Sequence, residues 1–265
     1  MNRAALLLCC AFAMGARGED LRASLTPRSP GNFPLLRPLK ANYSFGWTAI
    51  TAGRAEAEFT RGGGICKLKA RGGSLGLARA LWRLDADATS TVRASTLLPI
   101  CLVQTEQYSD EKRTTTVNYG PNGAARTRVR EPKDEDSGKT KRFKFAPMHD
   151  LHSALLFIRS QRLRQGDVVR LVAYPNADAY LAEAEVVGRE KLGAAGKEWP
   201  AIKLALRLKK VTKELGVEPD KKFKGAFAWL SDDADRLLLR VETDVMIGHV
   251  WMELQQVSFA SGSSK

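Results

Sequence analysis

Apolar and polar residues alternate with a period of two through most of this sequence, which restricts it to a fold built mainly from β-strands. The pattern starts near Lys40, where residues 43, 45 and 47 are aromatic and the residues between them are small or polar. Similar runs follow near residues 54–59, 65–71, 84–94, 100–108, 113–119, 124–130, 168–174, 179–189, 201–209, 226–231, 237–244 and 248–259. Their spacing is typical of antiparallel strands joined by short turns.

One long stretch, residues 148–163, has helical spacing instead. Leu151, Ala154, Leu155 and Ile158 recur at intervals of three and four residues, so a helix would place them on one face. We expect Leu151, Leu155 and Ile158 to form the buried core of this helix. Burial of each would contribute about 1.5–3 kcal/mol.

Together these patterns predict a mainly β protein: a single antiparallel, curved sheet or partly open barrel packed around one central amphipathic helix. No internal repeat or linker divides residues 39–259, so we expect one β-rich domain there and a flexible tail at 260–265. Residues 19–38 contain four prolines, which favour an extended leader over a helix.

The first eighteen residues have the features of a secretory signal peptide. Arg3 gives a positive start, residues 4–14 are apolar, and Ala16 and Gly18 are the small residues that a signal peptidase reads. We therefore expect cleavage after Gly18 and export, with a mature chain that begins at Glu19. Its expected location is the periplasm or the outer membrane.

The cysteines divide between the signal peptide and the mature chain. Lipidation at Cys9 or Cys10 is the alternative to simple cleavage, but a cut there would shorten the apolar run. Export leaves Cys66 and Cys101, and an even pair in an oxidising compartment predicts a disulfide. Two separately buried thiols are the alternative. No CxxC spacing indicates a metal site.

The chain is strongly basic, with a formal net charge of +13. An exported protein meets little nucleic acid, and we see no aromatic platform motif, so no nucleic-acid partner is expected. Lipid, lipopolysaccharide or an anionic membrane surface suits the compartment better. The expected contacts come from two charged loops: Lys139, Lys141, Arg142, Lys209, Lys210, Lys221, Lys222 and Lys224.

Histidines at the start of the predicted helix form one weak candidate site. His149, Asp150 and His152 combine ligand types that bind metals, but a site needs a further ligand, and His249 is the only other histidine. A hydrophilic helix N-terminus with His152 on the solvent side accounts for the same residues. No metal or other cofactor is predicted.

A pair of carboxylates, Asp232 and Asp233, is the second weak candidate. Such pairs serve in general acid/base catalysis or calcium binding. The segment SDDADR between two strand-like runs is equally typical of a tight turn, which is the preferred interpretation. No hydrolase, Walker, zincin or dinucleotide motif is present, so no catalytic residue is predicted and an enzyme is not favoured.

Several segments in order resemble the bacterial exported-protein family catalogued as domain of unknown function 3108. They are YSFGWTAITAGRAEAEF, STLLPICLVQTEQY, DLHSALLFIR followed by LRQGD, and WLSDDADRLLLRVETDVMIGHVWMEL. The resemblance spans roughly residues 39–257 and implies an exported, mostly β protein of the cell envelope. Some members look similar to periplasmic lipoprotein-carrier folds, which is an analogy of fold and not of activity.

Three functions from different classes remain open. The leading hypothesis is a non-enzymatic binder or carrier of an apolar or lipid-like ligand. The second is a structural or assembly factor that docks another envelope protein. The third is a hydrolase of envelope glycan or lipid.

Overall fold

A computed structural model of the chain describes residues 20–27, 29–220, 223 and 225–260. The strands are β1 (Leu39–Trp47), β2 (Ile50–Gly62), β3 (Ile65–Ser74), β4 (Asp85–Arg93), β5 (Pro99–Gln107), β6 (Lys112–Gly120), β7 (Gly123–Glu131), β8 (Thr140–Phe143), β9 (Val168–Ala173), β10 (Ala179–Ala194), β11 (Lys197–Val211), β12 (Val217–Pro219), β13 (Ala226–Ser231), β14 (Leu238–Asp244) and β15 (His249–Phe259). Two helices interrupt them, α2 (Gly76–Leu81) and α3 (Leu151–Ser160).

All of these strands belong to one antiparallel sheet. Its order is β8-β7-β6-β5-β4-β3-β2-β1-β15-β14-β13-β11-β10-β9, and β12 pairs with β11 beside this path. The sheet is not closed into a barrel, because no strand pairing joins β8 to β9 in the described part of the chain. The prediction of a mainly β protein with one antiparallel sheet is confirmed.

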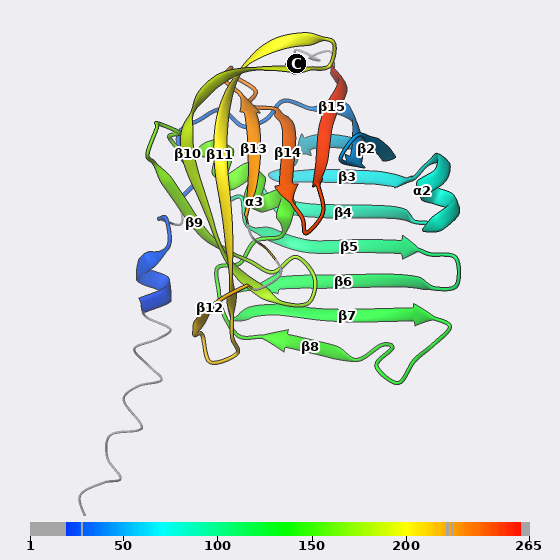
Figure 1. Cartoon of the computed structure of the whole chain (residues 1–265). Coiled ribbons are helices and arrows are strands. Elements are labelled where there is room, and N and C mark those ends of the chain that lie inside the picture. Colours follow the sequence, from blue (N-terminus) through cyan, green and yellow to red (C-terminus); the bar gives the residue numbers. More distant parts are fainter. Residues whose placement is uncertain (1–19, 28, 221–222, 224, 261–265) are drawn as a thin grey trace, which may run out of the picture.

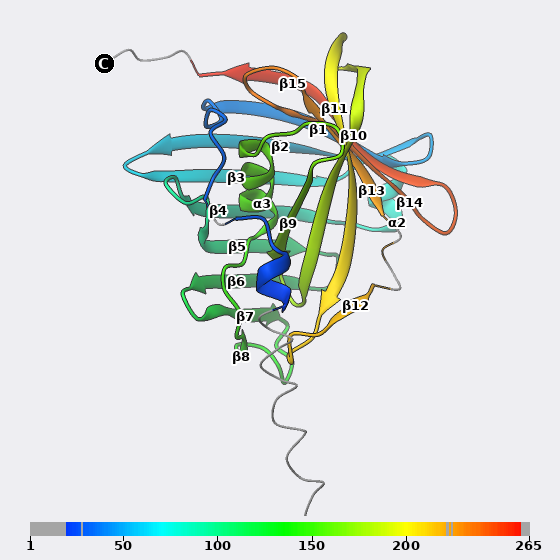
Figure 2. The same cartoon turned by 90° about the vertical axis from the view of Figure 1, so that its left-hand side faces the viewer.

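The sheet is strongly bent, so that its two halves face each other. In Figure 1 strands β3–β8 run horizontally, whereas β9–β11, β13 and β14 run steeply from top to bottom, with α3 between the two sets. Figure 2 shows α3 lying on the concave side of the sheet. Leu156 of α3 packs with residues of β1–β4, and Phe157 packs with residues of β9–β11 and β13. The helix therefore contacts both halves.

The buried face of α3 differs from the predicted one. Leu151 is 61% exposed, and Leu155 and Ile158 are only partly buried, whereas Leu156 and Phe157 are buried. The prediction for Leu151 is wrong. A helix that contacts two halves of a sheet buries a wider and differently oriented face than the narrow stripe expected for a helix on one surface.

The helix also begins later than predicted, at Leu151. The backbone before it is extended, because His149 N donates to Val172 O at 2.8 Å and Tyr174 N donates to His149 O at 2.7 Å. This pairing adds a bridge between His149 and Ala173 at the outer edge of β9. The preceding residues are thus part of the sheet and are not available to the helix.

The leader is not extended throughout, because residues 20–24 are helical. The first proline of the leader is Pro27, so no proline lies within this helical segment. Leu21 in the segment is buried against Val172 and Tyr174. Further along, Gly31 N donates to Ser160 Oγ at 3.1 Å, which holds the leader across the end of α3. The predicted signal peptide, Glu19 and residues 261–265 lie outside the described residues.

Cys66 and Cys101 are both free thiols, so the predicted disulfide is wrong. Cys66 of β3 pairs with Val92 of β4, and Cys101 of β5 pairs with Thr91 of the same strand. Strand β4 therefore separates them. Two strand spacings amount to about 9–10 Å, beyond the 4.4–6.8 Å between Cα atoms that a disulfide spans.

Candidate functional site

A cavity of about 190 Å³ lies between α3 and strands β1–β4. Its walls are mostly apolar and include Leu39, Phe59, Leu68, Leu155, Leu156 and Met252. Five polar side chains also reach it: Tyr43, Glu56, His152, Arg159 and Arg236. The cavity therefore combines an apolar interior with a few polar groups, which is the usual composition of a small-molecule site.

The N-terminal end of α3 is fixed by Asp150, which is fully buried. Its Oδ1 accepts from Ser153 N at 2.7 Å, and the Ser153 hydroxyl in turn accepts from Asp150 N at 3.0 Å, which completes a capping box. Ser90 of β4 donates its hydroxyl to the other carboxylate oxygen at 2.6 Å. One residue thus joins the helix to the sheet.

His149 lies beside this cap and does not face the cavity. Its Nδ1 is 3.2 Å from Ser153 Oγ, and its ring lies against Phe157. Burial lowers the pKa of His149 to about 4, despite the opposing field of Asp150. Although Ser153 and His149 resemble a nucleophile and its base, the Ser153 hydroxyl is fully buried and completes the cap, so it has a structural role.

His152 faces the cavity, contrary to its predicted place on the solvent side. Burial lowers the pKa of His152 below its ordinary value, although the charge of Asp150 opposes the change. The ring is therefore neutral at pH 7. Its Nδ1 is buried and has no hydrogen-bond partner within the described residues.

The C-terminal end of α3 is held by two arginines. Arg159 is 2% exposed and donates to Pro34 O at 2.9 Å and to Asp235 O at 2.8 Å. Arg236 Nη1 donates to Arg159 O at 2.5 Å and to Gln161 O at 2.6 Å. Cations here suit the negative end of the helix dipole and satisfy its last carbonyls.

Burial lowers the pKa of Arg159 to about 10, and the nearby charge of Arg236 adds to the effect. Arg159 remains a cation at pH 7. Its Nε is buried and lacks a hydrogen-bond partner among the residues that the structure describes. Two side chains that line the cavity, His152 and Arg159, thus each have one buried nitrogen without a partner in the described part of the chain.

Asp232 and Asp233 form the turn between β13 and β14. Asp233 Oδ1 accepts from Ser231 Oγ at 2.7 Å and from the backbone nitrogens of Asp235 and Arg236 at 3.0 Å each. Asp232 pairs with Arg189 at 2.7 Å. Their carboxylates are occupied by turn and ion-pair contacts, and neither residue lines the cavity.

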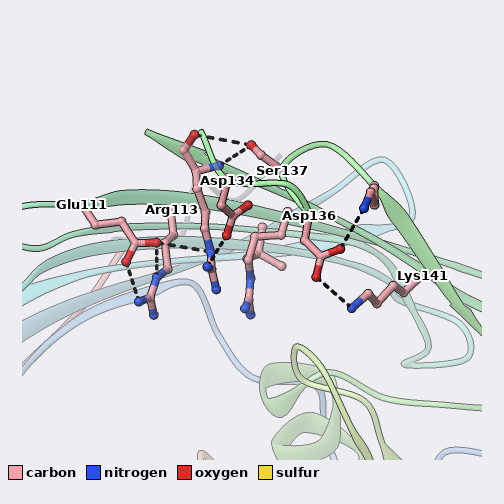
Figure 3. A network of polar contacts seen from close by, with 10 residues as sticks. Glu111, Arg113, Asp134, Asp136, Ser137 and Lys141 are labelled. Carbon is pink, nitrogen blue, oxygen red and sulfur yellow. Dashed lines mark hydrogen bonds and ion pairs between the residues drawn. The ribbon is translucent and has the colours of Figure 1, made fainter. Parts of the chain in front are cut away.

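Ion pairs within the first charged loop involve several of its predicted contact residues (Figure 3). Lys139 and Lys141 both pair with Asp136, at 3.2 and 3.7 Å. Arg130 of β7 pairs with Glu111 at 3.2 Å. The basic side chains of this loop are therefore partly neutralised by their neighbours.

The second charged loop begins with similar pairs. Lys209 lies 3.5 Å from Glu183, and Lys210 lies 3.0 Å from Asp178. Lys221, Lys222 and Lys224 are outside the described residues. Figure 1 shows the β7–β8 connection at the right of the view and β12 at the left.

The described residues contain no group of three or more His, Cys, Asp or Glu side chains that could hold a metal ion. His249 lies at the start of β15, where it pairs with Asp244 across the β14–β15 turn. Within the same residues, no helix has the length and apolar composition needed to cross a membrane.

Sequence comparison decides the family. The model described as Protein of unknown function (DUF3108) matches residues 42–255. The chain belongs to this family. The family prediction is confirmed, and the match includes all or part of each strand that lines the cavity of this DUF3108 protein. No curated protein matches the DUF3108 chain in sequence.

This DUF3108 protein also matches solved structures. A β-barrel-like protein of domain of unknown function 1849 from Brucella abortus has a TM-score of 0.57 and 8% identity, and the match covers 86% of this chain and 100% of that one. A candidate exported protein with a YmcC-like fold from Bacteroides fragilis reaches 0.37, with 10% identity and coverage of 86% and 99%. A candidate lipoprotein from Parabacteroides distasonis reaches 0.31, with 7% identity and coverage of 88% and 100%.

The sequence predicted neither the cavity nor its polar groups; His152 was a weak site candidate but was expected on the solvent side. Arg159 lies in the last turn of α3 and Arg236 in an acidic turn, both of which are places where exposed cations are common. The one signal that could have found Arg159 is its position next to the apolar residues 156–158 in an apolar helix.

Proposed function

We propose that this DUF3108 protein is an exported cell-envelope protein that binds an apolar chain with a polar end, such as a fatty acid or another acyl compound. The observation that supports this most directly is the apolar cavity beside α3, where His152 and Arg159 each present a buried nitrogen without a hydrogen-bond partner among the described residues. Unsatisfied buried polar groups are costly, and a ligand atom that pairs with them recovers this cost.

The size of the cavity limits the ligand. Its volume of about 190 Å³ slightly exceeds that of an engineered apolar cavity of about 150 Å³ that binds benzene. Sites for drug-sized ligands usually measure about 300–1,000 Å³. The cavity therefore suits a short acyl chain or the end of a longer one. Each methylene placed there would contribute about 0.8 kcal/mol.

The two polar groups define the end of the ligand. Arg159 is a cation, and a hydrogen bond from it to a carboxylate or carbonyl oxygen is strengthened by charge. His152 is neutral and can either donate or accept, depending on its tautomer. A carboxylate or ester carbonyl satisfies both more completely than a hydrocarbon does.

Two further observations support an envelope location. The first eighteen residues have the pattern of a secretory signal, and the family is matched over most of the remaining chain. A small β-sheet protein with an internal apolar cavity is well suited to carry lipid-like molecules through an aqueous compartment, because the ligand is removed from water.

Mass spectrometry of the native protein isolated from its own envelope tests the proposal. Extraction should release an acyl compound in stoichiometric amount. Ala57→Phe, which fills the cavity, should abolish this, while Ala177→Phe in the exposed loop before β10 should not. A native protein that releases nothing apolar and binds no member of a fatty-acid series would overturn the proposal.

A second measurement tests the polar end. Titration with a fatty acid and with the alcohol of equal chain length should show a preference for the acid. His152→Leu should reduce that preference about tenfold, the equivalent of one hydrogen bond of about 1.4 kcal/mol. Equal affinity for acid and alcohol in the natural chain would exclude the assigned role of these two residues.

A further inference from the structure

Large apolar side chains are exposed at one end of the sheet. Of the sixteen such side chains in the described residues, ten lie in residues 47–50, 75–82 and 245–250. We call these three segments the apolar rim. The most exposed members are Leu77 at 71%, Leu81 at 81%, Met246 at 93% and Ile247 at 72%.

Strand pairing brings the three segments side by side. Trp47 of β1 pairs with Val250 of β15, so the β1–β2 turn adjoins the β14–β15 turn. Gly53 of β2 pairs with Ser74 of β3, and Leu75 N donates to Ala52 O at 2.8 Å, so the segment containing α2 adjoins the β1–β2 turn. Figure 2 shows both turns projecting from the same side of the molecule, with α2 behind them.

The exposed positions are held in place by hydrogen bonds. Trp47 Nε1 donates to Ile247 O at 2.7 Å, and Thr48 N donates to His249 O at 2.7 Å. Trp251 Nε1 donates to Thr48 O at 2.8 Å. The apolar side chains of the two turns therefore project from a fixed framework.

The apolar rim contains one charged residue, Arg79. Just outside it lie Arg54 and Arg83, together with Asp85 and Asp244. Asp85 pairs with Arg79 at 2.7 Å and with Arg83 at 3.6 Å. The rim and its border therefore carry a small positive surplus, and apolar and aromatic side chains next to arginines match the interface of an anionic bilayer, where tryptophan and arginine are favoured.

We propose that the apolar rim docks the protein on the surface of a lipid bilayer that contains anionic headgroups. The side chains on the two turns and α2 would enter the interfacial layer, and the arginines would meet the headgroups. A fluid bilayer accommodates projecting turns that are spread along a curved sheet end. A second protein would need a surface shaped to each of them. The rim is separate from the cavity, so the docking does not depend on the proposed ligand.

Flotation with vesicles of phosphatidylethanolamine and phosphatidylglycerol tests the docking. The natural chain should float with these vesicles and bind less to phosphatidylcholine alone. The double variant Met246→Ser/Ile247→Ser should lower the partition coefficient about tenfold or more, because two apolar side chains no longer enter the interface. Val187→Ser/Val217→Ser, which alters exposed valines outside the rim, should partition as the natural chain does.

Further measurements separate docking on lipid from self-association and from ligand binding. Tryptophan emission should shift to shorter wavelength on vesicle binding, and Trp47→Ser/Trp82→Ser should remove most of the shift. Ala57→Phe should bind vesicles normally, so a failure of the cavity proposal would leave this one intact. Equal flotation of rim and control variants would overturn the proposal, as would a rim-dependent dimer in size-exclusion chromatography without flotation.

Discussion

The two ends of α3 are anchored by opposite chemistry. At the N-terminal end, the carboxylate of Asp150 accepts hydrogen bonds from Ser153 N and from the Ser90 hydroxyl, with no cation among these partners. At the C-terminal end, Arg159 and Arg236 donate to backbone carbonyls. Both arrangements suit the helix dipole. The first end is joined to strand β4, whereas the second is joined to the leader and the β13–β14 turn.

This difference indicates that the two ends respond to different perturbations. The N-terminal end includes a histidine whose pKa is lowered to about 4 by burial, so acid affects it. The C-terminal end contains arginines that remain charged across the same range. It also depends on residues 31–34 of the leader. Among these, the ring of Phe33 stacks on Arg236, whose Cζ lies 3.5 Å from the ring centroid. The following predictions test this contrast.

Replacing Asp150 with alanine should give the largest effect. Loss of the helix cap costs about 0.5–2 kcal/mol, and the unpaired Ser90 hydroxyl adds about 1–3 kcal/mol. We expect a decrease of about 2–5 kcal/mol in the free energy of unfolding, measured by urea titration. Asp150→Asn keeps the cap acceptor and should lose much less. Equal losses in the two variants would contradict the assigned role of the side-chain oxygen.

Acidification should destabilise the N-terminal end. His149 has a folded pKa of about 4 and an ordinary value of 6.5, so the unfolded chain binds more protons between these values. Stability is therefore complete above pH 6.5 and falls as the pH decreases toward 4. The loss due to this residue should reach about 3 kcal/mol near pH 4.

His149→Gln isolates this contribution, because it removes the titrating ring. The difference in unfolding free energy between the natural chain and His149→Gln should change with pH from 6.5 to 4. His249→Gln, at the opposite end of β15 from the leader, serves as the control. A difference that is constant with pH would show that His149 titrates normally.

Arg159→Leu should weaken the C-terminal end by about 2–3 kcal/mol, because Pro34 O and Asp235 O lose charge-assisted hydrogen bonds. Thermal and urea unfolding measure this loss. Arg159→Lys keeps the charge but cannot reach both carbonyls with a planar fork, so its stability should fall between those of the natural chain and Arg159→Leu. The effect should be the same at pH 7 and pH 5, in contrast to that of His149.

Phe33→Ala should have the smallest global effect, about 1–2 kcal/mol, through loss of its contacts with the guanidinium groups of Arg159 and Arg236. Its local effect should be larger. Amide exchange at Gly31 and Phe33, which are hydrogen-bonded to Ser160, should accelerate, while the amides of β4 should not change. Uniform acceleration across the sheet would show that the leader is not a separate unit.

The sequence was sufficient to predict most of the strands, because alternation records directly which side chains face the interior. It did not predict the short strands β8 and β12, which lie in the two segments expected to be charged loops. The helix was harder. Leu151, Leu155 and Ile158 form one stripe, but α3 contacts two halves of the sheet and buries Leu156 and Phe157 instead. Helical spacing specifies which residues share a face. It does not specify how many surfaces the helix meets.

The polar part of the site could not be predicted for a related reason. The two terminal nitrogens of Arg159 donate to Pro34 O and Asp235 O, which are 125 and 76 positions away along the chain. The Asp150 carboxylate likewise depends on Ser90, sixty positions away. Such contacts depend on the order of the strands in the sheet, which cannot be predicted from local residue patterns.

The two outer edges of the sheet have different protection against unwanted pairing. The chain itself covers β9, because residue His149 bridges to Ala173 and Thr26 N donates to Arg170 O at 3.0 Å. Strand β8 is short and exposed, and it carries Lys141 and Arg142. An open strand edge invites addition of a strand from another molecule, and like charges on both edges oppose it. Lys141 and Arg142 thus oppose the pairing of β8 with β8 of a second molecule at high protein concentration.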